Sequence, residues 1–103
     1  MNMKCADLLR EVADLVGGDR NDQHGDKHAN FHNIAGLWTA YLEAKNVDCT
    51  LTPEDVALMM VLLKVARTRT GCYNKDDFTD MCGYASIAYE LADCYDAFDP
   101  GET

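Results

Sequence analysis

Apolar residues recur along this chain with the spacing of an α-helix, and they do so in four separate segments. In the first, roughly residues 4–16, they stand three and four positions apart: Leu8, Leu9, Val12, Leu15 and Val16. This spacing places them on one face of a helix. The pair Gly17-Gly18 follows, and glycine commonly ends a helix. We therefore expect an amphipathic first helix that stops at this pair.

Two further segments show the same period. Residues 27–45 carry an apolar stripe made of Phe31, Ile34, Leu37, Trp38, Tyr41 and Leu42. The segment that starts at Lys75 follows Asn74, a suitable N-terminal cap, and has Asp76 and Asp77 in its first turn. Both segments are therefore expected to be helices.

The helix expected over residues 53–70 has the clearest start. Thr52 is a good N-cap, Pro53 suits the first helical position, and Glu54 and Asp55 favour the positive end of the helix dipole. The sequence "VALMMVLLKVA" is apolar on nearly every side. It predicts a central, buried helix that stops at Gly71.

Strand-like alternation of apolar and polar residues is absent, so the pattern predicts an all-α fold. The connectors are short, which favours antiparallel neighbours and an up-down bundle of about four helices. We expect a single helical domain over residues 1–95 and an acidic, frayed tail over residues 96–103.

The length of the chain limits its core. It has 103 residues, 48% of them hydrophobic, which suits one small domain with a thin core. A helical protein of this size often completes its core by self-association. We therefore expect a homodimer or a higher homo-oligomer.

The net charge of −9 argues against direct binding to a nucleic-acid backbone, which requires clustered Lys and Arg. It is compatible with ordinary solubility, with metal binding, or with an acidic surface that engages a basic protein face. Charged residues interrupt the N-terminal segment, and no apolar run reaches membrane-spanning length. The five cysteines form no CxxC pair, so we expect free, mostly buried thiols in a reducing cytoplasm.

Charged residues interrupt the apolar faces of the last two helices. Asp77 and Asp80 stand three residues apart on the stripe that continues through Met81, Tyr84, Ala88 and Leu91. Lys64 and Arg67 have the same spacing on the preceding helix. In a hairpin centred near Cys72, Arg67 lies level with Asp77 and Lys64 level with Asp80. Two purely structural ion pairs are one interpretation.

A functional interpretation adds residues from the second helix and the loop before it. In an up-down bundle the second helix starts at the same end, bringing Asn30 and the loop residues His24 and Asp26 to the four charged groups. Carboxylates suit Mg²⁺ or Mn²⁺, and the cations suit phosphate.

Two other features have simpler interpretations. Asp55 shares an apolar stripe with Met59 and Leu62, but lies at the far end of its helix and would reach such a site only across a subunit interface. A partner for the helix dipole is its simpler role. His28 and His32 have a metal-chelating spacing, but "HANFH" lacks the Glu of a metalloprotease motif, so an exposed pair is favoured.

Three blocks, "HGDKHANFHNIAGLWTAYL", "TPEDVALMMVLLKVAR" and "DDFTDMCGYASIA", are similar to an uncharacterised family of small phage and prophage proteins. The similarity covers roughly residues 19–90 and implies a phage or prophage origin without an activity.

A more distant resemblance is to the all-α, MazG-like nucleoside triphosphate pyrophosphohydrolases. Those are helical oligomers in which carboxylates of an EExxE and a later ExxD pattern hold Mg²⁺. Here "DFTD" matches the second pattern through Asp77 and Asp80, whereas "EDVALM" departs from the first. The departure fits nucleotide binding with or without hydrolysis.

The leading hypothesis is therefore a phage protein that binds a phosphorylated nucleotide at one end of the bundle. Asp77 and Asp80 are the candidate Mg²⁺ ligands, and Asp26, Asn30 and Tyr84 the candidate ligand contacts. In an enzyme, Lys64 and Arg67 would stabilise phosphate charge and His24 would transfer a proton. The alternative hypothesis is an acidic, non-enzymatic protein that binds and inhibits a host factor.

Overall fold

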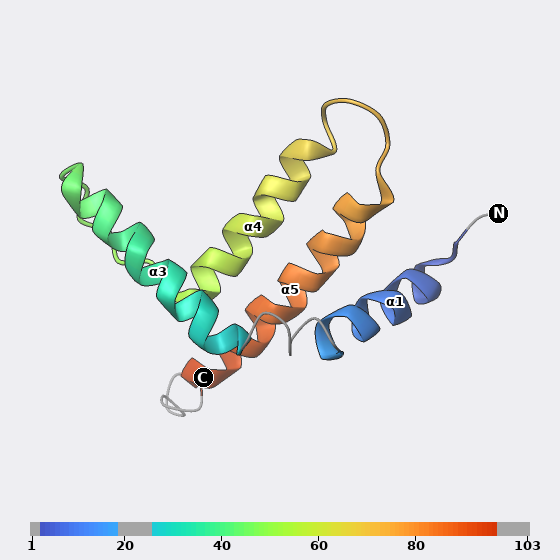
Figure 1. The fold of residues 1–103 in the computed structure, drawn as a ribbon, viewed down its shortest axis with the longest axis horizontal. Helices are drawn as coiled ribbons and strands as arrows, with labels where there is room; N and C mark the ends of the chain where they lie inside the picture. The colour runs from blue at the N-terminus through green and yellow to red at the C-terminus, as the bar shows by residue number, and fades with distance from the viewer. Residues whose placement is uncertain (1–2, 19–25, 97–103) are drawn as a thin grey trace.

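Over the residues that the structure describes, the chain folds as an all-α bundle of four helices (Figure 1). The computed structural model describes residues 3–18 and 26–96. Its helices are α1 (Cys5–Gly17), α3 (Lys27–Ala44), α4 (Pro53–Arg67) and α5 (Lys75–Asp96). The four helices expected from the sequence are confirmed, with ends within a few residues of the predicted ones. Across the described ranges, none of them combines the length and apolarity that crossing a membrane requires.

Side chains cap three of the helices where the sequence places capping residues. At the start of α4, the Asp55 amide donates to Thr52 Oγ1 (3.1 Å) and the Thr52 amide donates to Asp55 Oδ2 (2.9 Å). This is a reciprocal capping box. Asn74 caps α5 by accepting from the Asp76 amide, and Asp26 caps α3 by accepting from the His28 amide. The carboxylate of Asp55 therefore interacts with the start of its own helix, which is the simpler role expected from the sequence.

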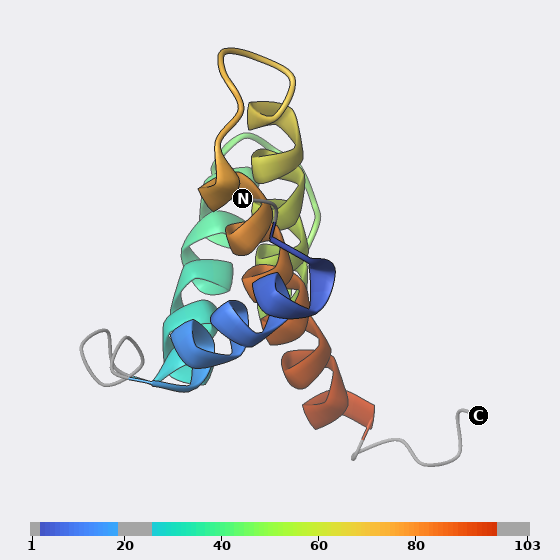
Figure 2. The same ribbon diagram turned by 90° about the vertical axis from the view of Figure 1, so that its right-hand side faces the viewer.

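Helices α4 and α5 form an antiparallel hairpin, and α1 lies along the other side of α5 (Figures 1 and 2). Gly71 sits in the turn of the hairpin with a φ of +74°, a conformation that glycine adopts without strain. The packing of α1 on α5 is tied by an ion pair between Glu11 and Lys75 (3.0 Å). Val12 is the buried residue of α1.

The connector between α3 and α4 folds back along α3. The Val47 amide donates to the Leu42 carbonyl, and the Leu51 amide donates to Thr39 Oγ1 (2.9 Å each). Helix α4 therefore begins beside the middle of α3, and the two helices diverge from there (Figure 1). This turn-back decides which parts of the chain can meet at each end of the hairpin.

The core lies where α3, the start of α4 and the second half of α5 meet. Its buried members are Phe31, Ala35, Val56, Ala57, Ala88 and Leu91. Ile34, Trp38, Tyr84 and Ile87 pack against it from the side. The core is thin, as the length of the chain predicts.

The prediction that α4 is buried on nearly every side is wrong for the single chain. Only Pro53, Val56 and Ala57 are buried along this helix. Among the described helices, α3 and α5 pack on α4 and cover one side of it. Helix α1 packs on α5 instead, so it leaves the other side of α4 uncovered. The opposite side of α4 carries exposed apolar residues: Leu58, Met59, Leu62 and Val65.

The expectation of mostly buried thiols is also wrong for the described cysteines. Cys5, Cys49, Cys72 and Cys82 are free, and the first three are exposed. Cys49 and Cys72 lie in connectors, and Cys5 starts a helix, so none of these three can reach the core between α3, α4 and α5.

Candidate functional site

Four charged side chains meet where α4 ends and α5 begins, and we call Lys64, Arg67, Asp77 and Asp80 the hairpin cluster. Lys64 Nζ lies 3.1 Å from Asp80 Oδ2, and Arg67 Nε lies 3.7 Å from Asp77 Oδ1. Each pair consists of residues equally far from Cys72, as the antiparallel hairpin predicts. The pairing expected from the sequence is therefore confirmed.

The two pairs differ in burial and in strength of contact. The side chains of Lys64 and Asp80 are both largely covered. Asp77 is buried, yet the side chain of Arg67 is 60% exposed. Their separation of 3.7 Å exceeds hydrogen-bonding distance, so Arg67 holds Asp77 by charge alone. The hairpin cluster thus contains one ion pair in direct contact, Lys64–Asp80, and one with a longer separation, Arg67–Asp77.

The structure separates the hairpin cluster from Asp26 and Asn30. Next to Asp26, Lys27 and His28 both contact Glu90 of α5. Glu90 lies thirteen residues after Asp77, about 20 Å farther along the helix at 1.5 Å per residue. The expected meeting of these stretches at one bundle end is therefore wrong. Because the connector folds back along α3, the start of that helix lies beside the second half of α5.

The other sequence-predicted residues have different positions. The ring of Tyr84 lies 6.3 Å from that of Phe31 and packs against the core, as its place on the apolar stripe predicts. His24 lies outside the described residues. Of the predicted site, the structure therefore brings together the four members of the hairpin cluster.

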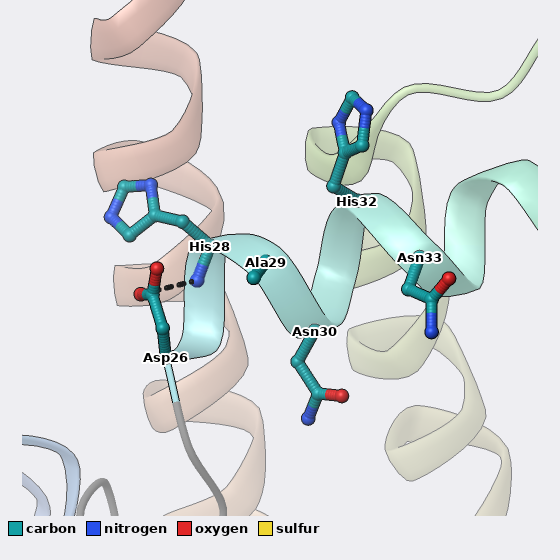
Figure 3. A pocket seen from close by; sticks show the side chains of 6 residues that line it. All are labelled: Asp26, His28, Ala29, Asn30, His32 and Asn33. Carbon is teal, nitrogen blue, oxygen red and sulfur yellow. Dashed lines mark hydrogen bonds between the residues drawn. The ribbon is translucent and has the colours of Figure 1, made fainter.

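The start of α3 forms a shallow, open surface lined by Asp26, His28, Ala29, Asn30, His32 and Asn33. Figure 3 shows that the two histidine side chains lie on one side of the helix and that Asn30 points to the other. Asp26 accepts a hydrogen bond from the His28 amide (3.1 Å). The side chains around this surface do not converge on one point.

Glu90 organises a small charged group that the sequence analysis missed. His28 Nε2 donates to Glu90 Oε2 over 2.6 Å, and Lys27 Nζ lies 3.5 Å from the same oxygen. The hydrogen bond from His28 lowers the pKa of the Glu90 carboxyl, whereas partial burial raises it. The positive charge of Lys27 also lowers this pKa. No short-range pattern links these residues, because the contact depends on how α3 packs on α5.

The hairpin cluster offers two carboxylates to a cation. Within residues 3–18 and 26–96, no group of three or more His, Cys, Asp or Glu side chains is placed to hold a metal ion. Two carboxylates are nevertheless a common protein contribution to Mg²⁺, which usually keeps waters and takes its remaining ligands from the phosphates of a substrate. The donor set therefore fits Mg²⁺ that arrives with a phosphorylated ligand.

Comparison with known proteins places this sequence in a family. Residues 7–92 match the family described as Domain of unknown function (DUF6378). The chain is 42% identical over 84 residues to the Gene 55 protein of Mycobacterium phage D29, covering 82% of the chain and 52% of the relative. It is 40% identical over 84 residues to the Gene 55 protein of Mycobacterium phage L5, covering 82% and 51%.

The chain thus spans about half the length of the phage proteins it matches. No solved structure matches it. The matched region contains all of α3 and α4, the hairpin cluster and most of α1 and α5. The similarity to a phage protein family is confirmed, and the chain belongs to the DUF6378 family.

Proposed function

We propose that the hairpin cluster binds the phosphate groups of a nucleotide together with Mg²⁺. The observation that carries this proposal is the presence of two carboxylates and two cations at the turn end of the α4–α5 hairpin, in pairs 3.1 and 3.7 Å apart. The MazG-like resemblance of "DFTD" supports the same role for Asp77 and Asp80. The start of α3, with Asp26 and Asn30, is not part of this proposed site.

Binding would exchange the partners within the cluster. Asp77 and Asp80 would turn from their cations to Mg²⁺, and Lys64 and Arg67 would turn to the phosphate oxygens. Each charge keeps an opposite charge beside it, so the exchange leaves no unpaired ion in a partly buried place. Arg67 is suited to begin it, because its side chain is exposed and its contact with Asp77 is long. Arginine also matches phosphate geometry well.

Thermal unfolding of the full chain, with Mg²⁺ and a panel of ribo- and deoxyribonucleoside triphosphates, tests the proposal. At about ten times the dissociation constant, a ligand stabilises the fold by about 1.4 kcal/mol. For a domain of this size, Tm then rises by about 5 °C or more. We expect the rise only when Mg²⁺ and a nucleotide are both present.

Two variants of α5 test whether the rise in Tm depends on the hairpin cluster. Asp80→Asn removes one proposed ligand and should abolish the rise in Tm. Asp76→Asn makes the same chemical change at an exposed position without an ion pair, and should preserve it. Release of phosphate or pyrophosphate from the same mixtures shows whether binding leads to hydrolysis.

An unchanged Tm with every triphosphate would overturn the proposal, and so would equal behaviour of the two variants. The alternative of an acidic inhibitor then makes its own prediction. The wild-type chain and Asp80→Asn would retain the same host protein, in equal stoichiometry, on an affinity column.

A further inference from the structure

The outer side of α4 is an apolar surface that no described element covers. Leu58, Met59, Leu62 and Val65 are each at least 40% exposed, and Leu62 reaches 66%. At 100° per residue these side chains occupy the half of the helix opposite Val56 and Ala57, which are buried. We call these four residues the outer face of α4. Four large apolar residues together on one short helix mark a contact surface.

No described element reaches this surface, since α3 and α5 pack on the other side of α4 and α1 packs on α5. Figures 1 and 2 show α1 separated from α4 by α5. Among the residues of this sequence outside the described ranges, the large apolar ones are Met1 and Phe98.

The charges on the outer side of α4 favour one kind of partner. Asp55 is in the first turn of the helix, on the side of Met59 and Leu62, and Arg69 follows in the turn after the helix. Lys64 and Arg67 lie on the other side, where they pair with α5. A surface that is acidic at one end and basic at the other attracts a copy of itself that runs in the opposite direction, whereas a parallel copy would place like charges together.

The registration of such a pair follows from simple counting. With a two-fold axis at Leu62, Asp55 of one copy lies level with Arg69 of the other, and Leu58 lies level with Ala66. The most exposed residue of the outer face then packs against itself, and a large residue faces a small one. Asp55 lies on the same helix face as Met59 and Leu62. Its Oδ2 accepts from the Thr52 amide within its own chain, so Oδ1 is the oxygen that would face Arg69 of the other copy.

We propose that a second copy of this chain packs on the outer face of α4, antiparallel and around a two-fold axis near Leu62. The outer face suits a copy despite the acidic chain as a whole, because each Asp55 would face an Arg69 of the other copy. A two-fold contact requires a surface that is complementary to itself, and an acid at one end with a base at the other meets that requirement. The contact does not depend on the nucleotide proposal.

Sedimentation equilibrium of the full chain over a concentration series tests this proposal. The wild type should reach twice the mass of one chain. Leu62→Glu places two carboxylates together on the axis and should leave a monomer. Leu9→Glu is the matched control, because Leu9 is also more than half exposed but lies on α1. It should dimerise like the wild type.

A charge variant tests the antiparallel direction. Arg69→Glu would place a carboxylate beside Asp55 of the other copy at both ends of the contact. The repulsion between these like charges should weaken dimerisation roughly 3- to 10-fold. Helical circular dichroism of each variant confirms that the fold is kept. A monomeric wild type would overturn the proposal. So would a dimeric Leu62→Glu, equal losses in Leu62→Glu and Leu9→Glu, or no weakening by Arg69→Glu.

Discussion

His28 and Glu90 join the start of α3 to the second half of α5 through a hydrogen bond of 2.6 Å. The two residues are 62 positions apart, and no turn or hairpin dictates their meeting. Their contact fixes where α3 begins relative to α5. It therefore also fixes how far Asp26 lies from the hairpin cluster.

The Glu90 contact predicts a pH-dependent contribution to stability. Because folding lowers the pKa of Glu90, its contribution is present above the pKa of the unfolded chain and is lost as the pH falls through the folded-state pKa. Glu90→Gln should lower Tm near neutral pH. The gap to the wild type should narrow as the pH falls through the folded-state pKa of Glu90, because its carboxylate then takes up a proton and loses its charge.

Thermal unfolding by circular dichroism across that pH range measures the gap. Glu43→Gln is the control, since Glu43 is an exposed glutamate of α3 whose carboxylate forms no ion pair with another described residue. A gap between Glu90→Gln and the wild type that stays constant down to about pH 3 would show that the contact acts through packing instead of charge.

The ion pair between Lys64 and Asp80 should contribute more than a typical surface pair. Both side chains are largely covered and their charged atoms are 3.1 Å apart. A double-mutant cycle with Lys64→Met and Asp80→Asn should give a coupling of about 1 kcal/mol in urea unfolding at fixed protein concentration. The exposed pair Asp7–Arg10, three residues apart on α1, should give less than about 0.5 kcal/mol. Equal coupling energies for the two pairs would show that burial does not strengthen the interaction between Lys64 and Asp80.

Two glycines should respond to alanine with opposite signs. A Cβ at Gly36, inside α3, meets no atom within 4 Å, so Gly36→Ala should stabilise the fold by about 0.5–1 kcal/mol through helix propensity. Gly71 has open space too, but its φ is +74°. Gly71→Ala should therefore destabilise the fold by about 1 kcal/mol. Urea midpoints of both variants measure the contrast, and stabilisation by Gly71→Ala would contradict the assigned turn.

The local features of the chain followed from its sequence because they depend on neighbouring residues. Thr52 and Asp55 form the cap of α4, and Asn74 caps α5, at the predicted positions. The pairing of Lys64 with Asp80 was predictable for the same reason. A short turn between two helices fixes which residues are level, so counting from Cys72 was sufficient.

Contacts between elements far apart in the chain were not predictable in this way. Placing Asp26 near Asp77 required the direction of α3 relative to α5, which depends on the path of the connector after Ala44. That path is set by hydrogen bonds to Leu42 and Thr39, which no periodic pattern encodes. Among the predicted site residues that the structure describes, those within one hairpin came together.

By itself, the sequence determined the four helices, the caps of α4 and α5 and the two ion pairs of the hairpin, because each depends on spacing along a helix or across a short turn. The tertiary structure alone decided that α3 starts beside Glu90, and that Leu62 faces outward although α4 is apolar on nearly every side. Hydrophobicity indicates that a helix face needs a partner. Which faces find one within the chain depends on how the whole set of helices packs.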